Sequence, residues 1–197
     1  NQWFGVCRNI TRASVGRDRS RRDSAVTADL SVQVGSLTLP NPVMTASGTA
    51  GHGTELAAYL DLSSLGAFVV KSLSAEPWAG NPAPRVHQTP AGMINSVGLQ
   101  GPGVMSWLSS GLVDLERAGV ERVVVSIWGR TVEEYRAAAT MLANAPSSVI
   151  AVEVNLSCPN LDGGRHLFAH DPAQAAEVIG VCAAANRPLW AKLSPNT

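Results

Sequence analysis

The stretch VIAVEVN, residues 149–155, followed by LSCPN, residues 156–160, decides the predicted fold. Its first part is a β-rich run with little polar alternation, which is typical of a strand buried on both faces of a parallel sheet. The run ends at Asn155 in a cluster of polar side chains and a cysteine. The stretch therefore predicts an α/β protein whose functional residues lie at the carboxyl ends of parallel strands.

Similar β-rich runs recur along the chain, at residues 42–46, 67–70, 122–127 and 189–193. Helical patterns separate most of them, at residues 54–65, 104–118, 131–144 and 171–186. Thr131 and Asp171 are typical helix N-caps, and Pro172 suits a first helical turn. Ahead of this alternation, two short runs at 30–34 and 36–40 flank Gly35 and predict a β-hairpin.

Two architectures are compatible with the alternation. A dinucleotide-binding sheet requires G-x-G-x-x-G after its first strand, but ASGTAG at residues 46–51 has the wrong glycine spacing. A (β/α)8 TIM barrel instead places a polar residue at the end of each strand, which here are Ser47, Lys71, Ser126, Asn155 and Lys192. We favour the barrel. Because a barrel takes about 250 residues, we expect residues 29–197 to be its N-terminal part, truncated after about strand five.

Composition excludes several classes of function. The chain has 197 residues, 45% of them hydrophobic, with 15 basic and 15 acidic residues, so it offers no electrostatic case for nucleic acid or a membrane surface. No apolar run approaches the ~18 residues of a membrane span. Three scattered cysteines predict neither a disulfide scaffold nor a metal site, and they favour a reducing compartment, hence the cytoplasm.

Residues 1–28 differ from the rest of the chain. They hold six arginines and two acidic residues, with almost no apolar periodicity. We predict a basic disordered arm. An address signal or a nucleic-acid arm is the less favoured alternative.

Three features carry candidate chemistry: the two lysines, Cys158 and the loop at residues 73–103. Lys71 and Lys192, the only lysines, both follow predicted strands; each is either a lysine reaching solvent or an ammonium that holds an anionic substrate or a flavin edge. Cys158 lies among proline and carboxamides at the predicted barrel mouth, where a thiol can act as base or nucleophile, whereas Cys182 in an amphipathic run is expected to be a small buried hydrophobe. The 73–103 segment holds five prolines and exceeds an ordinary connection, so we predict an ordered functional loop.

Six motifs in order resemble the class 1, soluble dihydroorotate dehydrogenases, and are closest to the heteromeric catalytic-subunit branch. They are NP at 41–42 with ASG at 46–48, VKS at 70–72, GNP at 80–82 with PR at 84–85, INSVGL at 94–99, NLSCPN at 155–160, and KLSPN at 192–196. The resemblance covers residues 30–197. Three positions depart from the family pattern: Gly101, Ser126 and the bulky Trp128.

The resemblance implies an FMN enzyme that oxidises dihydroorotate to orotate in de novo pyrimidine (UMP) biosynthesis. Cys158 would be the base that removes the C5 proton while a hydride leaves C6 for the flavin. The residues that would bind the substrate are Lys71, Asn95, Val97, Gly98, Leu99, Asn155 and Asn160. Those that would bind FMN are Ser47, Lys71, Ser72, Ser126, Asn155 and Lys192.

The resemblance also implies partners. The heteromeric branch passes electrons to a subunit with FAD and an iron–sulfur cluster, and then to NAD, whereas a fumarate-using homodimer is the other class 1 form. We expect a homo- or hetero-oligomer. Two alternatives remain: a related FMN barrel acting on another reduced pyrimidine, and a non-catalytic fragment. Because barrel phosphate sites are frequently built after strands seven and eight, residues 1–197 alone are expected to be inactive.

Overall fold

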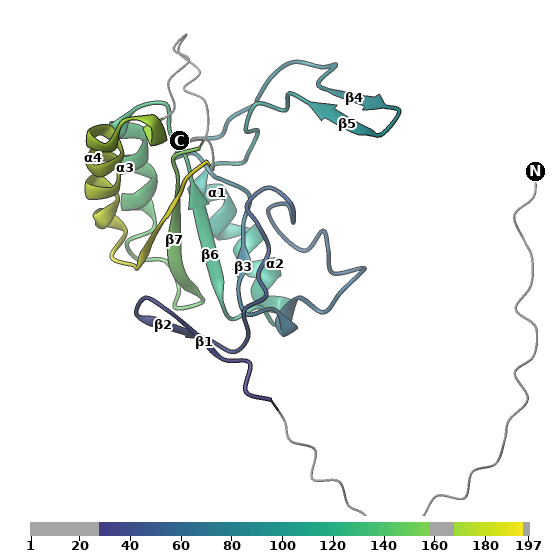
Figure 1. Cartoon of the computed structure of the whole chain (residues 1–197), viewed down its shortest axis with the longest axis vertical. Coiled ribbons are helices and arrows are strands. Elements are labelled where there is room, and N and C mark those ends of the chain that lie inside the picture. Colours follow the sequence, from purple (N-terminus) through teal and green to yellow (C-terminus); the bar gives the residue numbers. More distant parts are fainter. Residues whose placement is uncertain (1–27, 158–167, 195–197) are drawn as a thin grey trace, which may run out of the picture.

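The computed structural model describes residues 28–157 and 168–194, and its centre is a four-stranded parallel sheet (Figure 1). The strands are β3 (Phe68–Val69), β6 (Val123–Ile127), β7 (Val149–Asn155) and β8 (Leu189–Lys192). Their order across the sheet, β3-β6-β7-β8, is also their order along the chain. Every crossover therefore advances by one strand in one direction, as in a barrel and not as in a doubly wound sheet, where the order reverses.

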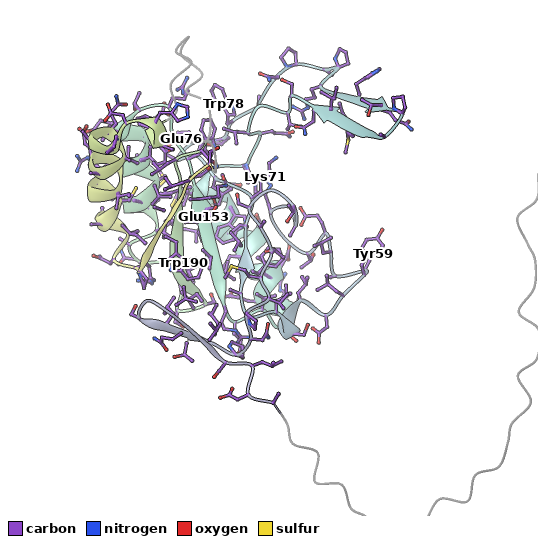
Figure 2. The ribbon with its side chains drawn as sticks, viewed as in Figure 1. Tyr59, Lys71, Glu76, Trp78, Glu153 and Trp190 are labelled. Atoms are coloured by element: carbon purple, nitrogen blue, oxygen red, sulfur yellow. The ribbon has the colours of Figure 1, made fainter. Side chains whose placement is uncertain are left out.

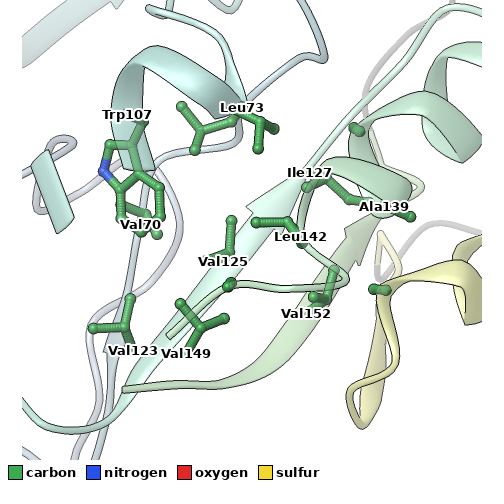
Figure 3. Close-up of a cluster of buried hydrophobic side chains, with 14 of the residues drawn as sticks. Val70, Leu73, Trp107, Val123, Val125, Ile127, Ala139, Leu142, Val149 and Val152 are labelled. Atoms are coloured by element: carbon green, nitrogen blue, oxygen red, sulfur yellow. The ribbon is translucent and has the colours of Figure 1, made fainter. Parts of the chain in front are cut away.

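Helices cover one face of this sheet. They are α1 (Val104–Ser109), α2 (Gly111–Arg117), α3 (Val132–Met141) and α4 (Pro172–Cys182). Figure 3 shows the resulting core, in which Val125 and Val152 of the sheet meet Trp107 of α1 and Ala139 of α3. Thr131 and Asp171 cap α3 and α4 through their side-chain oxygens, as the sequence predicts. Three short 3-10 helices complete the described set: η1 (Leu62–Ser64), η2 (Phe168–His170) and η3 (Ala183–Ala185).

The opposite face of the sheet packs against a hairpin. Strands β1 (Val32–Val34) and β2 (Leu37–Leu39) pair antiparallel around Gly35, whose φ is +58°. Their apolar side chains meet Val69, Val124 and Ala151. The hairpin lies at the amino ends of the strands (Figure 1), so it covers the inner face at the end remote from the polar strand ends.

Two predicted elements differ in the structure. The predicted strand at 42–46 is reduced to one parallel bridge, between Met44 and Ala67. The reason is Thr45, whose hydroxyl accepts from Val69 N at 2.7 Å and donates to Val69 O at 3.0 Å, so a side chain replaces the backbone ladder. The predicted helix at 54–65 is a series of turns ending in η1. There the Glu55 carboxylate accepts from His52 N and Gly53 N, which holds the segment in a turn.

The predicted helix at 104–118 is broken at Ser110, between α1 and α2. The hydroxyls of Ser109 and Ser110 both donate to the carbonyl of Ser106, and such side-chain bonds compete with helical ones. Within the 73–103 loop, the strands β4 (Val86–Thr89) and β5 (Gly92–Asn95) form a second hairpin that projects from the sheet (Figure 1). The sequence predicts order in this loop but does not predict the hairpin.

Two findings apply to the described residues only. Within 28–157 and 168–194, no helix has the length and apolar character that crossing a membrane requires. In the same ranges, no three His, Cys, Asp or Glu side chains gather as a metal would need. The predicted arm at residues 1–28 lies almost entirely outside the described residues.

Candidate active site

Three serine hydroxyls form a chain across the carboxyl end of the sheet. Ser72 follows β3 and Ser126 lies in β6, and both are buried. The Ser72 Oγ lies 2.9 Å from Ser47 Oγ and 2.8 Å from Ser126 Oγ. Three residues that the sequence analysis assigned to the flavin are therefore in direct contact with one another.

The chain continues to a charged pair. The Ser126 hydroxyl donates to Glu153 Oε1 at 2.7 Å, and the Lys192 ammonium lies 3.4 Å from the same oxygen. Glu153 is absent from the sequence-predicted site. The period of two along β7 could have found it, because Ala151 lies on the inner face and residue 153 shares that face.

Asn155, the last residue of β7, is held from three sides. Its Nδ2 donates to Ser72 Oγ at 2.9 Å, and its Oδ1 accepts from the N–H and the hydroxyl of Ser157 at 3.2 and 2.7 Å. Its backbone carbonyl accepts from the buried Tyr135 hydroxyl at 2.6 Å. The predicted carboxamide is thus fixed in the same network as the serines.

Lys71 lies beside this network at the end of β3 (Figure 2). Its backbone N–H donates to Gly51 O at 2.9 Å. Burial lowers the pKa of the Lys71 ammonium, the positive charge of Arg85 lowers it further, and the carboxylate of Glu55 opposes both. A partly desolvated cation gains by taking an anionic ligand, because the ligand restores the interactions that burial removed.

A cavity of about 700 Å³ opens on one side of Lys71. Its lining includes Asn95 at the end of β5 and the turn Val97-Gly98-Leu99. Gly98 and Leu99 both have positive φ, +72° and +59°, and Leu99 is the unusual one because side chains rarely adopt that conformation. Four predicted substrate residues therefore share one cavity with Lys71.

Hydrogen bonds within the 73–103 loop hold the root of this loop beside the cavity. The Trp78 indole donates to Gly98 O at 2.8 Å, and the backbones of Trp78 and Gly101 exchange two hydrogen bonds. Arg85 donates to Ala79 O and Asn81 O, each at 3.1 Å, and to the Gln100 side chain. The root of the loop is therefore fixed although its tip projects.

A second cavity, of about 680 Å³, is also lined by Lys71, together with His52, Trp78 and Gln100 among others. His52 Nε2 is buried without a hydrogen-bond partner among the described residues. Burial lowers the pKa of this imidazole, and the nearby Lys71 cation lowers it further. His52 lines this cavity and was not among the residues predicted from the sequence.

Trp128, which departs from the family pattern, packs outside these two cavities. Its ring meets Trp78 edge-on at 5.9 Å, and Arg130 lies over the Trp78 ring at 4.9 Å. The bulky side chain thus supports the loop root and does not line either cavity beside Lys71.

The predicted catalytic Cys158 and the predicted substrate residue Asn160 lie outside the described residues. Cys182 is buried as predicted, and burial raises the pKa of its thiol to about 12. It is a packing residue of α4.

A sheet wound in one direction, with helices on one face and polar side chains at its carboxyl edge, defines a barrel-type α/β protein. The family model for dihydroorotate dehydrogenase matches residues 29–197, and the chain belongs to this family. The family has a TIM-barrel fold, in agreement with the parallel α/β sheet.

Relatives named "Dihydroorotate dehydrogenase B (NAD(+)), catalytic subunit" match most of the chain. The protein of Geotalea daltonii is 47% identical over 169 residues, which are 85% of this chain and 55% of the relative. That of Desulforudis audaxviator is 51% identical over 166 residues, which are 84% of this chain and 53% of the relative. That of Pelobacter propionicus is 46% identical over 169 residues, which are 85% of this chain and 55% of the relative. The chain thus spans about half the length of the curated relatives it matches.

Proposed function

We propose that the protein carrying this chain oxidises dihydroorotate to orotate with FMN, in pyrimidine biosynthesis. The observation that carries the proposal is the position of Lys71. It lies beside the hydroxyl chain at the sheet edge, and it lines the cavity that also contains Asn95, Val97, Gly98 and Leu99. One cation can therefore face a cofactor bound at the sheet edge and a substrate bound in the cavity.

The side chains at the sheet edge fit a flavin. An isoalloxazine presents carbonyl oxygens and ring nitrogens that accept hydrogen bonds, and one or more N–H groups that donate. Lys71 and Lys192 supply ammonium donors, and Ser47 supplies a hydroxyl. Ser72 holds Ser47 in place, and Ser126 and Asn155 in turn hold Ser72, through the hydrogen bonds described above. FMN bound there would supply the acceptor for the hydride.

The cavity beside Lys71 fits a small carboxylated ring. Dihydroorotate combines a carboxylate, which a cation favours, with ring N–H and C=O groups, which a carboxamide such as Asn95 can pair. Cys158 is the proposed base for the C5 proton. It comes three residues after Asn155 in the motif that resembles the family, and Asn160 is a further proposed substrate contact.

We extend the proposal to partners through the names of the relatives. "Catalytic subunit" and "NAD(+)" in those names support a second subunit that carries electrons to NAD. An FAD and iron–sulfur subunit, in a cytoplasmic hetero-oligomer, is the partner that we propose.

The test is to purify the full-length protein, record its flavin absorbance after desalting, and add dihydroorotate without oxygen. We expect bleaching of the bound flavin by dihydroorotate and at least tenfold slower bleaching by dihydrouracil, which lacks the carboxylate. Faster reduction by dihydrouracil would mean that the substrate is a reduced pyrimidine other than dihydroorotate. Absence of a flavin would refute the proposal.

A further inference from the structure

Glu153 has no place in the function proposed above, yet its environment is that of a built site. It lies on the inner face of β7 near the site, with its side chain 13% exposed (Figure 2). Its Oε1 accepts a hydrogen bond from the Ser126 hydroxyl and forms a salt bridge with the Lys192 ammonium. A carboxylate so enclosed must influence whatever these two residues do.

The hydrogen bonds of Asn155 have a defined direction. The backbone N–H of Ser157 can only donate, so the Asn155 atom that it meets at 3.2 Å is the oxygen Oδ1. The other terminal atom, Nδ2, therefore faces Ser72 and donates to its hydroxyl oxygen. One of the two lone pairs of Ser72 is occupied by this bond.

The same reasoning orients the serines. A carboxylate can only accept hydrogen bonds, so Ser126 donates its single hydroxyl proton to Glu153. In the 2.8 Å contact between Ser72 and Ser126, the proton must then come from Ser72. Ser72 has no second proton, so in the 2.9 Å contact with Ser47 the donor is Ser47. The chain runs one way, from Ser47 through Ser72 and Ser126 to Glu153.

Ser47 is left with lone pairs and no spare proton. It has no other side-chain hydrogen bond among the described residues, and it lies next to Gly48, which lines the cavity of Lys71. A ligand at Ser47 must therefore present an N–H or an O–H, because an acceptor there would meet only lone pairs.

We propose that Glu153 is a positioning residue of the cofactor site, which rests on the proposed function. As the terminal acceptor it makes Ser47 an acceptor for a ligand N–H, and as the counterion of Lys192 it reduces the positive charge that Lys192 offers to the ligand. Its two actions on a flavin have opposite signs. The reduced flavin carries one more N–H than the oxidised form, and a negative charge. With that additional N–H at Ser47, which the proposal requires, the hydroxyl chain favours the reduced form, and the neutralised Lys192 favours it less.

Two substitutions separate these actions. Glu153→Gln keeps the shape and removes the charge, and the Lys192 ammonium orients the new amide oxygen toward itself and Ser126. The direction of the chain persists while Lys192 loses its counterion, so we expect the flavin reduction potential to rise. Ser126→Ala frees the proton of Ser72 to point at Ser47 and the proton of Ser47 to point at the ligand. We expect the potential to fall.

The measurement is the reduction potential of FMN in the full-length protein, with FMN affinity as a second readout. We expect shifts of opposite sign, each about tenfold in the ratio of affinities for the two flavin forms, which is about 30 mV for a two-electron couple. Thr45→Val is the matched control. It removes a hydroxyl that binds the backbone of β3 without touching the chain, and it should leave the potential unchanged.

Ser72→Ala replaces Ser126→Ala if the latter does not fold, because it also frees the proton of Ser47 and predicts the same negative shift. Shifts of the same sign in the glutamate and serine variants, or no shift in either while FMN is retained, would overturn the role of Glu153. Absence of FMN from the unsubstituted protein would instead overturn the proposed function.

Discussion

The two sides of Lys71 are built in different ways. On the sheet side, Ser72, Ser126 and Asn155 are 2%, 0% and 3% exposed and bond to one another. On the cavity side, the hairpin of β4 and β5 projects from the sheet, and Met93 and Ile94 are 67% and 64% exposed. The proposed cofactor side is thus formed by strands that the core already fixes, whereas the proposed substrate side is carried by a hairpin that, among the described residues, is held at its root.

This difference has a physical reason. A buried hydroxyl or amide must find a partner, so polar groups at the sheet edge hold one another in one arrangement. An exposed hairpin has water as its partner and is free to move with a ligand. We therefore expect the sheet edge to be the rigid side of the proposed site and the hairpin to be its more mobile side.

The largest effect is expected for Cys158→Ala, three residues after Asn155 in the sequence. Loss of a general base costs at least about 10²-fold, so flavin reduction by dihydroorotate should slow by that factor while FMN binding is retained. Stopped-flow absorbance without oxygen measures the rate. Unchanged reduction at pH 7 would remove Cys158 from the mechanism.

A matched pair of valines compares the stability of the two regions. Val125 in β6 is 0% exposed and Val86 in β4 is 52% exposed. Val125→Ala should lower the free energy of unfolding by about 2 kcal/mol, and Val86→Ala by less than about 0.5 kcal/mol. Urea unfolding of both variants measures these changes, and equal losses in the free energy of unfolding would mean that the hairpin is part of the core.

The two lysines should divide the ligands between them. Lys71→Ala should weaken both FMN and dihydroorotate by about tenfold, since a hydrogen bond to a charged group contributes about 1.5–3 kcal/mol. Lys192→Ala should weaken FMN alone, because Lys192 is on the sheet side and does not line the cavity. Titration of each ligand is the measurement, and identical losses in both variants would contradict the division.

The smallest effect concerns pH. Because burial and Lys71 lower the pKa of His52 from its ordinary 6.5, the unfolded chain binds a proton near that pH that the folded protein does not. The contribution of His52 to stability is therefore unfavourable at low pH and vanishes above 6.5. We expect His52→Gln to gain stability relative to the unsubstituted protein as the pH falls from 7.5 to 5, and a constant difference would show that His52 titrates normally.

The sequence predicted the strands of the sheet well and the hairpin beside the cavity poorly. Apolar runs located β6, β7 and β8 within a residue of their ends. The pattern is strongest in β6 and β7, which are rich in β-branched residues and mostly buried, whereas β8 has no β-branched residue and is only partly buried. The β4–β5 hairpin was missed because all four residues of β5 are exposed, so no apolar alternation marks it.

Side chains that act on the backbone account for the other differences. Thr45 takes the place of a strand ladder, and Glu55 holds a turn where a helix was predicted; neither bond leaves a periodic signal. Glu153 was missed because an acid inside an apolar run is an exception to the pattern that defined the strand. Ser47 and Ser126 were predicted at strand ends from the sequence pattern, and Ser72 from resemblance, but the contacts of the three serines with one another could come only from the structure.

The β1–β2 hairpin also has a consequence for synthesis. Its apolar side chains pack on Val69, Val124 and Ala151, and the last of these leaves the ribosome roughly a hundred residues after the hairpin. Because synthesis proceeds at about 5–20 residues per second, the apolar face of the hairpin stays uncovered for several seconds. During that interval a chaperone or a neighbouring nascent chain can bind it, so the element that later covers the inner face of the sheet is also the earliest point at which assembly can go wrong.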